Sequence, residues 1–213
     1  MAINLGGMFG GNNDSSNNSN PFNNGVSPLN LQKNDILDLT KKNPGLQQVI
    51  LGAGWDVAVS GQDFDLDIAA FLLNGNGKVA NVPADVIFFN NPQGQGIALS
   101  SDNRSGAGNG DDERINIDLS QIRSDVQKIV FCVTIHNAQE RRQTFGMVDN
   151  SYVRILDAKN NEKEVCRFNL KEDGSTVTSI IFAELYRDGF DWQFKALGEG
   201  KIADLNGLLA LYM

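Results

Sequence analysis

The chain is poor in cysteine, histidine and basic residues, and each shortage excludes a class of function. Its 213 residues include two cysteines, Cys132 and Cys166, and one histidine, so neither a disulfide framework nor a zinc-binding pattern fits. The 26 acidic residues outnumber the 18 basic ones, and the net charge is -8. Because nucleic acids and anionic lipids bind basic faces, we expect no nucleic-acid partner and no direct electrostatic binding to lipid.

Long hydrophobic runs are also missing. No stretch of eighteen apolar residues occurs, and the first residues lack the basic and apolar regions of a signal peptide. We therefore expect a soluble, cytoplasmic protein whose cysteines are buried free thiols. With 41% hydrophobic residues, the chain is long enough for one well-buried core.

Residues 1–27 differ in composition from the remainder. Most of residues 6–25 are Gly, Asn and Ser, which cannot bury enough apolar surface to offset the entropy lost on ordering. The sequence predicts a flexible tail over residues 1–27 and a folded domain over residues 28–213.

Short apolar stretches separated by turn residues recur through the folded part. Their spacing of about ten residues predicts a mainly all-β protein, an antiparallel β-sandwich with a few short helices. Residues 128–136 form a nearly continuous apolar run, typical of a central strand covered on both faces, and residues 203–212 have leucines at helical spacing. We also expect a hairpin over residues 29–39, and we expect the strand at 49–59 to lie beside the strand that holds Asp65.

An acidic, glycine-rich loop covers residues 101–113. It holds Asp102 and the consecutive Asp111, Asp112 and Glu113, and three glycines allow the backbone to curl. Two carboxylates held about 4 Å apart repel by roughly 4 kcal/mol at an effective surface dielectric, so a loop that gathers several needs a counter-ion. Carboxylate and amide oxygens favour a hard cation, and calcium is the natural candidate.

A second acidic cluster lies at residues 63–67, with the sequence DFDLD. Side chains alternate along a strand, so Asp63, Asp65 and Asp67 would share one face at intervals of about 7 Å, while Phe64 and Leu66 enter a core. Aspartate is a poor strand former, which favours a role for this face in binding a cation. The alternative is a solvated acidic surface without an ion.

The loop does not match the EF-hand pattern. With Asp102 at position 1, Glu113 falls correctly at position 12, but position 3 is Arg104 and position 6, where glycine is needed, is Ala107. The flanking residues read as strands rather than helices, so any calcium site is carried by loops on a sheet.

Several motifs together resemble the TerD family of tellurium-resistance and stress-response proteins of bacteria. The motifs match in order and spacing over roughly residues 28–209. They are GWD at 54–56, DFDLD at 63–67, FFNN at 88–91, DNRSG at 102–106 with GDDE at 110–113, TIHNA at 134–138, FG at 145–146 and ELYR at 184–187. The resemblance implies a calcium-binding β-sandwich that is not an enzyme.

The family's acidic motifs imply a set of calcium ligands, with two ions expected. The residues that match them are Asp65, Asp67, Asp102, Asn103, Asp111, Asp112 and Glu113, with Asp56 as a secondary candidate. Asn109 stands where the family usually has aspartate, which removes one negative charge near the site. The resemblance also implies protein partners in a stress-response or tellurium-resistance complex, membrane-associated or not, and no small-molecule substrate.

Other interpretations remain open. The same carboxylates could hold magnesium for phosphoryl transfer or hydrolysis, which would make the protein a metal-dependent enzyme. His136 could serve as a general base, although a lone histidine at a strand end is more typical of a structural residue. The cysteines could react with tellurium oxyanions as thiolates, but burial would make them inert.

Overall fold

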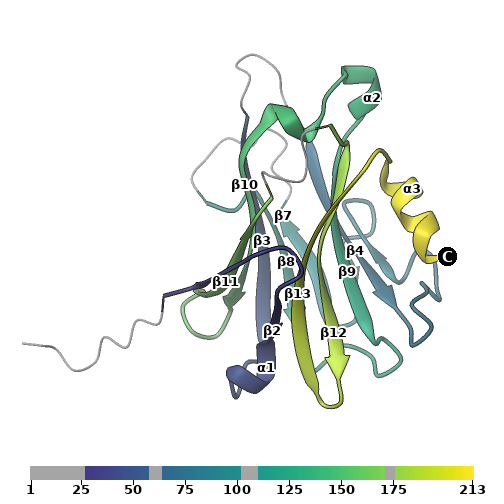
Figure 1. Ribbon diagram of the computed structural model, residues 1–213. Helices are drawn as coiled ribbons and strands as arrows, with labels where there is room; N and C mark the ends of the chain where they lie inside the picture. The colour runs from purple at the N-terminus through teal and green to yellow at the C-terminus, as the bar shows by residue number, and fades with distance from the viewer. Residues whose placement is uncertain (1–26, 58–63, 102–109, 171–175) are drawn as a thin grey trace, which may run out of the picture.

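The computed structural model describes residues 27–57, 64–101, 110–170 and 176–213. These residues form two sheets that lie face to face, which we call sheet A and sheet B (Figure 1). The prediction of an antiparallel β-sandwich with a few short helices is confirmed, and the tail predicted over residues 1–27 lies almost wholly outside the described residues.

Sheet A contains the strand that begins at the last residue of the acidic loop, and sheet B contains the strand that begins within the DFDLD cluster. In spatial order, sheet A consists of β1 (Leu29–Leu31), β11 (Lys163–Asn169), β10 (Val148–Asp157), β3 (Gln48–Val57), β8 (Glu113–Asp118), β7 (Ile97–Ser101) and β6 (Gln93–Gly94). Sheet B consists of β2 (Ile36–Asp38), β13 (Asp191–Lys201), β12 (Ser179–Asp188), β9 (Lys128–Ile135), β4 (Leu66–Leu73) and β5 (Val86–Ile87). Among these described strands, neighbours run antiparallel except β1 and β11.

Strands β4 and β9 are apolar on both faces because sheet B is covered on both sides. In β4, Leu66 and Ile68 belong to the core between the sheets, whereas Ala69 and Phe71 belong to a second apolar cluster on the outer face. Residues 128–135 therefore form an interior strand, as the continuous apolar run at 128–136 predicts.

The C-terminal residues cover the outer face of sheet B. Helix α3 (Leu205–Leu209) and the 3-10 turn η2 (Ala210–Tyr212) lie against this face (Figure 1). Leu208 is completely buried, the Tyr212 ring lies 5.7 Å from that of Phe71, and the Val79 N–H donates to the Tyr212 carbonyl at 2.8 Å. The helical spacing predicted for residues 203–212 is thus confirmed.

Two predictions of strand pairing are wrong. Residues 29–39 do not form a hairpin, because β1 pairs with β11 in sheet A while β2 pairs with β13 in sheet B. Strands β3 and β4 are not neighbours, since β3 lies between β10 and β8 and β4 lies between β9 and β5. In both cases the apolar pattern predicts a strand correctly but carries no information on which sheet the strand joins.

The remaining helices are short. Helix α1 (Leu39–Lys42) follows β2, α2 (Ala138–Arg141) follows β9, and the 3-10 turn η1 (Phe145–Met147) precedes β10. No described helix has the length and apolar character needed to span a bilayer.

The outer face of sheet A carries a row of arginines. The register places Arg114 of β8, Gly52 of β3, Arg154 of β10 and Arg167 of β11 side by side. Like charges opposite each other on a sheet are destabilising, so the row needs acidic partners. Glu164 supplies one by accepting hydrogen bonds from Arg154 at 3.0 Å and from Arg167 at 2.9 Å.

We predict that Leu208→Ala lowers the free energy of unfolding by about 2–4 kcal/mol, because it removes a fully buried side chain between α3 and sheet B. Leu211→Ala is the matched control, since this leucine is 54% exposed, and it should change stability by less than about 0.5 kcal/mol. Urea unfolding of both variants measures the difference. Equal effects would mean that α3 does not contribute to the core.

We predict that Glu164 stabilises the fold at neutral pH and loses this effect in acid. Hydrogen bonds from Arg167, and then from Arg154, hold the pKa of Glu164 below its ordinary value of 4.5 despite partial burial. Its contribution is therefore present above about pH 4.5 and disappears as the pH falls through the lowered pKa of the folded protein. Urea unfolding against pH should show wild type and Glu164→Gln converging in acid, while exposed Glu199→Gln stays close to wild type throughout.

Candidate cation-binding site

The three consecutive acidic residues that end the acidic loop point in three different directions. Asp112 continues the pairing of β3 with β8: its N–H donates to the Ala53 carbonyl at 2.8 Å, and its Oδ2 accepts the Trp55 N–H at 2.9 Å. The Asp112 carboxylate thus replaces a backbone carbonyl at the end of the ladder. It is buried beside the strand rather than free in solvent.

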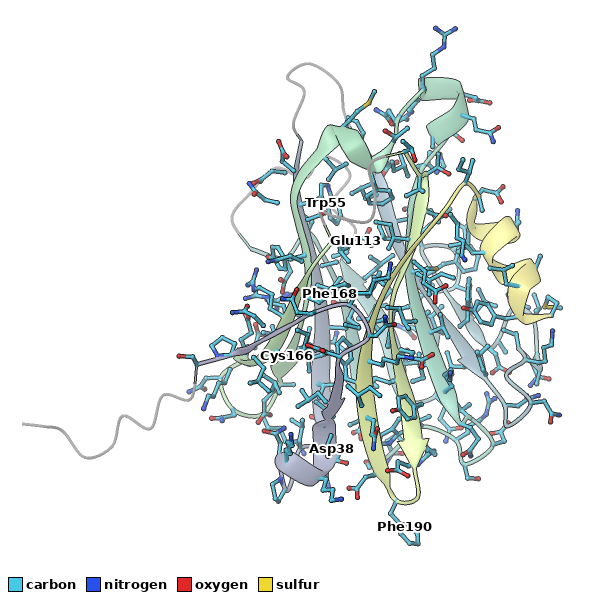
Figure 2. The ribbon with its side chains drawn as sticks, in the orientation of Figure 1. Asp38, Trp55, Glu113, Cys166, Phe168 and Phe190 are labelled. Atoms are coloured by element: carbon cyan, nitrogen blue, oxygen red, sulfur yellow. The ribbon has the colours of Figure 1, made fainter. Side chains whose placement is uncertain are left out.

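Glu113 connects the two sheets. Its side chain starts on β8 in sheet A, is 1% exposed, and accepts the N–H of Ile68 in β4 of sheet B at 2.7 Å through Oε2. Figure 2 places Glu113 near Trp55 in the upper half of the sandwich. A buried carboxylate is costly unless it is hydrogen-bonded or paired, and a charge-assisted bond to a backbone N–H offsets part of that cost. The two acidic stretches therefore come together at this hydrogen bond.

Asp65 and Asp67 lie on the side of β4 away from the core between the sheets. Both are half-buried and alternate with the buried Phe64, Leu66 and Ile68, as the predicted strand periodicity requires. Asp67 is adjacent in sequence to the residue that Glu113 contacts. Its Oδ2 lies 3.6 Å from Nδ1 of His136, which is too long for a hydrogen bond.

Asp111 points away from Asp112 and Glu113. Its side chain is completely buried on the outer face of sheet A. Oδ2 accepts from Arg114 Nε at 3.0 Å, and Oδ1 accepts from Arg154 Nε at 2.7 Å and from the Tyr152 hydroxyl at 3.2 Å. We call these four residues the outer-face cluster. The three partners of Asp111 are not predicted by the sequence motifs. The signals that point to them are two glycines in β3, at positions 52 and 54, and alternate polar residues in β10.

The remaining predicted ligands divide into two groups. Asp56 is exposed near the end of β3, and its Oδ2 accepts a hydrogen bond from Asn150 Nδ2 at 2.8 Å, whereas Asp112 is buried. Asp102 and Asn103 lie outside the described residues. Within the part of the chain that the structure describes, no group of three or more His, Cys, Asp or Glu side chains is arranged to hold a metal ion.

The chemistry of the donors fits a hard cation. Asp65, Asp67, Asp112 and Glu113 offer only oxygen atoms, which suit calcium or magnesium and not a soft metal. A further polar atom lies close by: the buried indole Nε1 of Trp55 has no hydrogen-bond partner among the described residues. An indole N–H cannot bind a cation, but it can orient a carboxylate that does.

His136 has the position expected of a strand-end residue. Its backbone N–H donates to the Asp65 carbonyl at 2.8 Å, which holds the end of β9 against the start of β4. A cavity of about 270 Å³ borders His136 and Asp67, with Phe88 and Phe89 on its wall. The cavity leaves room for a small molecule beside the acidic strand.

The two cysteines are free and buried, as predicted. Burial raises the pKa of Cys166 to about 12, and burial likewise raises the pKa of Cys132. Since the thiolate is the reactive form, neither residue is placed for chemistry in the folded protein.

Comparison with known proteins identifies the family. The TerD domain sequence model matches residues 28–212. The tellurium resistance protein TerD of Serratia marcescens is 44% identical over 187 residues, which cover 86% of this chain and 96% of the relative. The general stress protein 16U of Bacillus subtilis (strain 168) is 46% identical over 176 residues, which cover 81% of this chain and 90% of the relative.

Solved structures give the same result for the fold. A crystal structure of a protein of unknown function, SAV2460, has a TM-score of 0.63 at 26% identity, with 78% of this chain and 95% of that chain covered. A Streptomyces coelicolor A3(2) homologue of the telluride resistance protein TerD has a TM-score of 0.63 at 23% identity, with 76% and 94% covered. The chain belongs to the TerD domain family.

Proposed function

We propose that the protein is a non-catalytic calcium-binding domain of the tellurium-resistance and stress-response type. The observation that carries the proposal is the meeting of two acidic stretches, distant in sequence, at the hydrogen bond between Glu113 and Ile68. Asp112 and Glu113, which are buried, belong to the acidic segment of sheet A, and Asp65 and Asp67, which are half-buried, belong to the acidic segment at the start of β4. A divalent cation would offset the repulsion among these carboxylates.

The proposed ligands are Asp65, Asp67, Asp112 and Glu113, together with Asp102 and Asn103 from the acidic loop, and two ions are expected. Calcium takes six to eight oxygen ligands in flexible geometry, which agrees with ligands drawn from two strands and a loop. The bound ion would fix the loop next to β4. The surface formed in this way would bind protein partners in a cytoplasmic complex.

The biological setting of the proposal comes from the relatives. Proteins named for tellurium resistance and for general stress are similar to nearly the whole folded part of this chain. Both cysteines are buried with raised pKa values, so we propose that the domain acts through calcium and protein partners and does not bind tellurium oxyanions through thiolates.

We predict that calcium raises the melting temperature of the wild-type protein by about 5–10 °C over the value in chelator. A ligand at 100 times its Kd stabilises the native state by about 2.7 kcal/mol, and each kcal/mol shifts the melting temperature of a domain of this size by about 2–4 °C. Magnesium at the same concentration should give a smaller shift. An identical melting temperature in calcium, magnesium and chelator would contradict the proposal.

We predict that Asp65→Asn and Asp112→Asn each reduce the calcium-induced shift by at least about half, because ligand charge sets calcium affinity. Asp112→Asn is informative because the amide oxygen can still accept the Trp55 N–H, so stability in chelator should change little. Asp188→Asn is the matched control, since Asp188 is an exposed residue of the β12–β13 hairpin. A full calcium shift in both test variants would remove these residues from the site.

The cavity beside Asp67 and His136 supports a second candidate, a metal-dependent hydrolase. A magnesium or manganese ion held by Asp67 could activate water for attack on a phosphate ester in this cavity. The discriminating assay is hydrolysis of para-nitrophenyl phosphate with each metal. Turnover that requires the metal and is lost in Asp67→Asn would favour the enzyme over the binding domain.

A further inference from the structure

The Asp111 carboxylate lies in a position on the outer face of sheet A that is formed by Gly52, Arg114 and Arg154. Gly52 lies between Arg114 and Arg154 in the register of the sheet, and the Asp111 carboxylate lies directly above it, bound to both guanidinium groups. A Cβ on Gly52 would lie only 2.3 Å from Asp111 Oδ2, and a Cβ on Gly54 would lie 2.5 Å from the Tyr152 hydroxyl oxygen. Glycine is therefore required at both positions for this close approach.

The charge around Asp111 excludes a cation from its carboxylate. Both oxygens are already hydrogen-bonded, and the side chain has no exposed surface. A divalent ion placed about 5 Å from one guanidinium group would be repelled by roughly 7 kcal/mol at an effective dielectric of about 20, and here two such groups flank the Asp111 carboxylate. The arginine row also needs Asp111, since Arg114 and Arg154 would otherwise face each other across Gly52 without this shared counter-charge.

The backbone turns next to Asp111, so Asp112 and Glu113 do not share its position on the outer face of sheet A. Gly110 has φ of +120°, a value open to glycine, and the chain turns there before β8 begins at Glu113. With Asp111 held on the outer face, Asp112 bonds to β3 and Glu113 enters the space between the sheets. The pairing of Glu113 with the core residue Ala53 directs its side chain inward, and Asp111, held on the outer face two residues earlier, marks the point at which the chain enters this pairing.

We infer that Asp111 is a positioning residue of the proposed calcium site and not a calcium ligand. Through Arg154, Arg114 and Tyr152 it fixes the start of β8, so that Asp112 and Glu113 are directed toward the cation. This inference rests on the proposed function, and it changes the role that the sequence pattern assigns to Asp111. Partners that orient metal ligands typically affect metal affinity by about 10- to 100-fold.

A double-mutant cycle distinguishes the two roles. Calcium titration calorimetry is carried out on wild type, Asp111→Asn, Arg154→Met and the double variant. A positioning role predicts that each single variant lowers calcium affinity about tenfold, that the number of bound ions is unchanged, and that the double variant is no weaker than the weaker single. A ligand role predicts instead that Asp111→Asn loses a bound ion while Arg154→Met keeps or raises the affinity, and this result would overturn the inference.

Two further variants separate positioning from a general loss of stability. Arg123→Met breaks an unrelated ion pair, in which Arg123 Nη1 lies 2.8 Å from the buried Asp85, and it should lower stability without changing calcium affinity. Gly52→Ala should displace the Asp111 carboxylate and weaken calcium binding to the same degree as Asp111→Asn. If all outer-face variants resemble Arg123→Met, Asp111 is a structural residue only and the inference fails.

Failure of the proposed function can be recognised separately. If the wild-type protein binds no calcium, the proposed function and the cation-directed part of the inference both fail. The outer-face cluster is then judged by urea unfolding in chelator. Losses of unfolding free energy that are not additive for Asp111→Asn and Arg154→Met would confirm the contact between Asp111 and Arg154. Additive losses would refute this contact too.

Discussion

The hydrogen bond from Ile68 to Glu113 is the contact on which the arrangement of the acidic residues depends. Strand β5 pairs with β4 only at Ala70 and Phe71, so the edge of β4 is not covered by β5 at Ile68. The Glu113 carboxylate takes over as acceptor at that point, and it does so from the opposite sheet. One buried side chain therefore supplies the acceptor for the Ile68 N–H at the edge of sheet B and brings the acidic segment of sheet A beside the DFDLD cluster.

Consecutive carboxylates repel each other, and the fold resolves this by giving each a separate set of donors. Asp111 is bound by guanidinium groups, Asp112 by the backbone of β3, and Glu113 by the backbone of β4. These donors differ in charge. The guanidinium groups carry a positive charge that offsets the charge of Asp111, whereas the backbone N–H groups that bond to Asp112 and Glu113 carry no formal charge.

The sequence alone predicts the strands and the acidic segments well, because both depend on local patterns. Alternation between residues 64 and 68 gives the correct faces of β4, and the apolar run at 128–136 gives an interior strand. The sequence does not predict that β3 and β4 belong to different sheets. Nor does it predict that residues 29–31 join sheet A while residues 36–38 join sheet B, since strand pairing is decided by contacts between distant residues. The direction of Asp111 could not be predicted for the same reason: its partners Tyr152 and Arg154 lie some forty residues later in the chain.

The two tryptophans lie in different surroundings, and this gives the molecule a pair of built-in fluorescent probes. Trp55 donates its backbone N–H to Asp112, while Trp192 lies next to the β12–β13 turn with the Arg187 guanidinium 4.3 Å from its ring. A chain that carries phenylalanine at position 192 would have Trp55 as its single tryptophan. Its spectrum would then follow the environment of the acidic segment without any attached label, in the same sample used for unfolding.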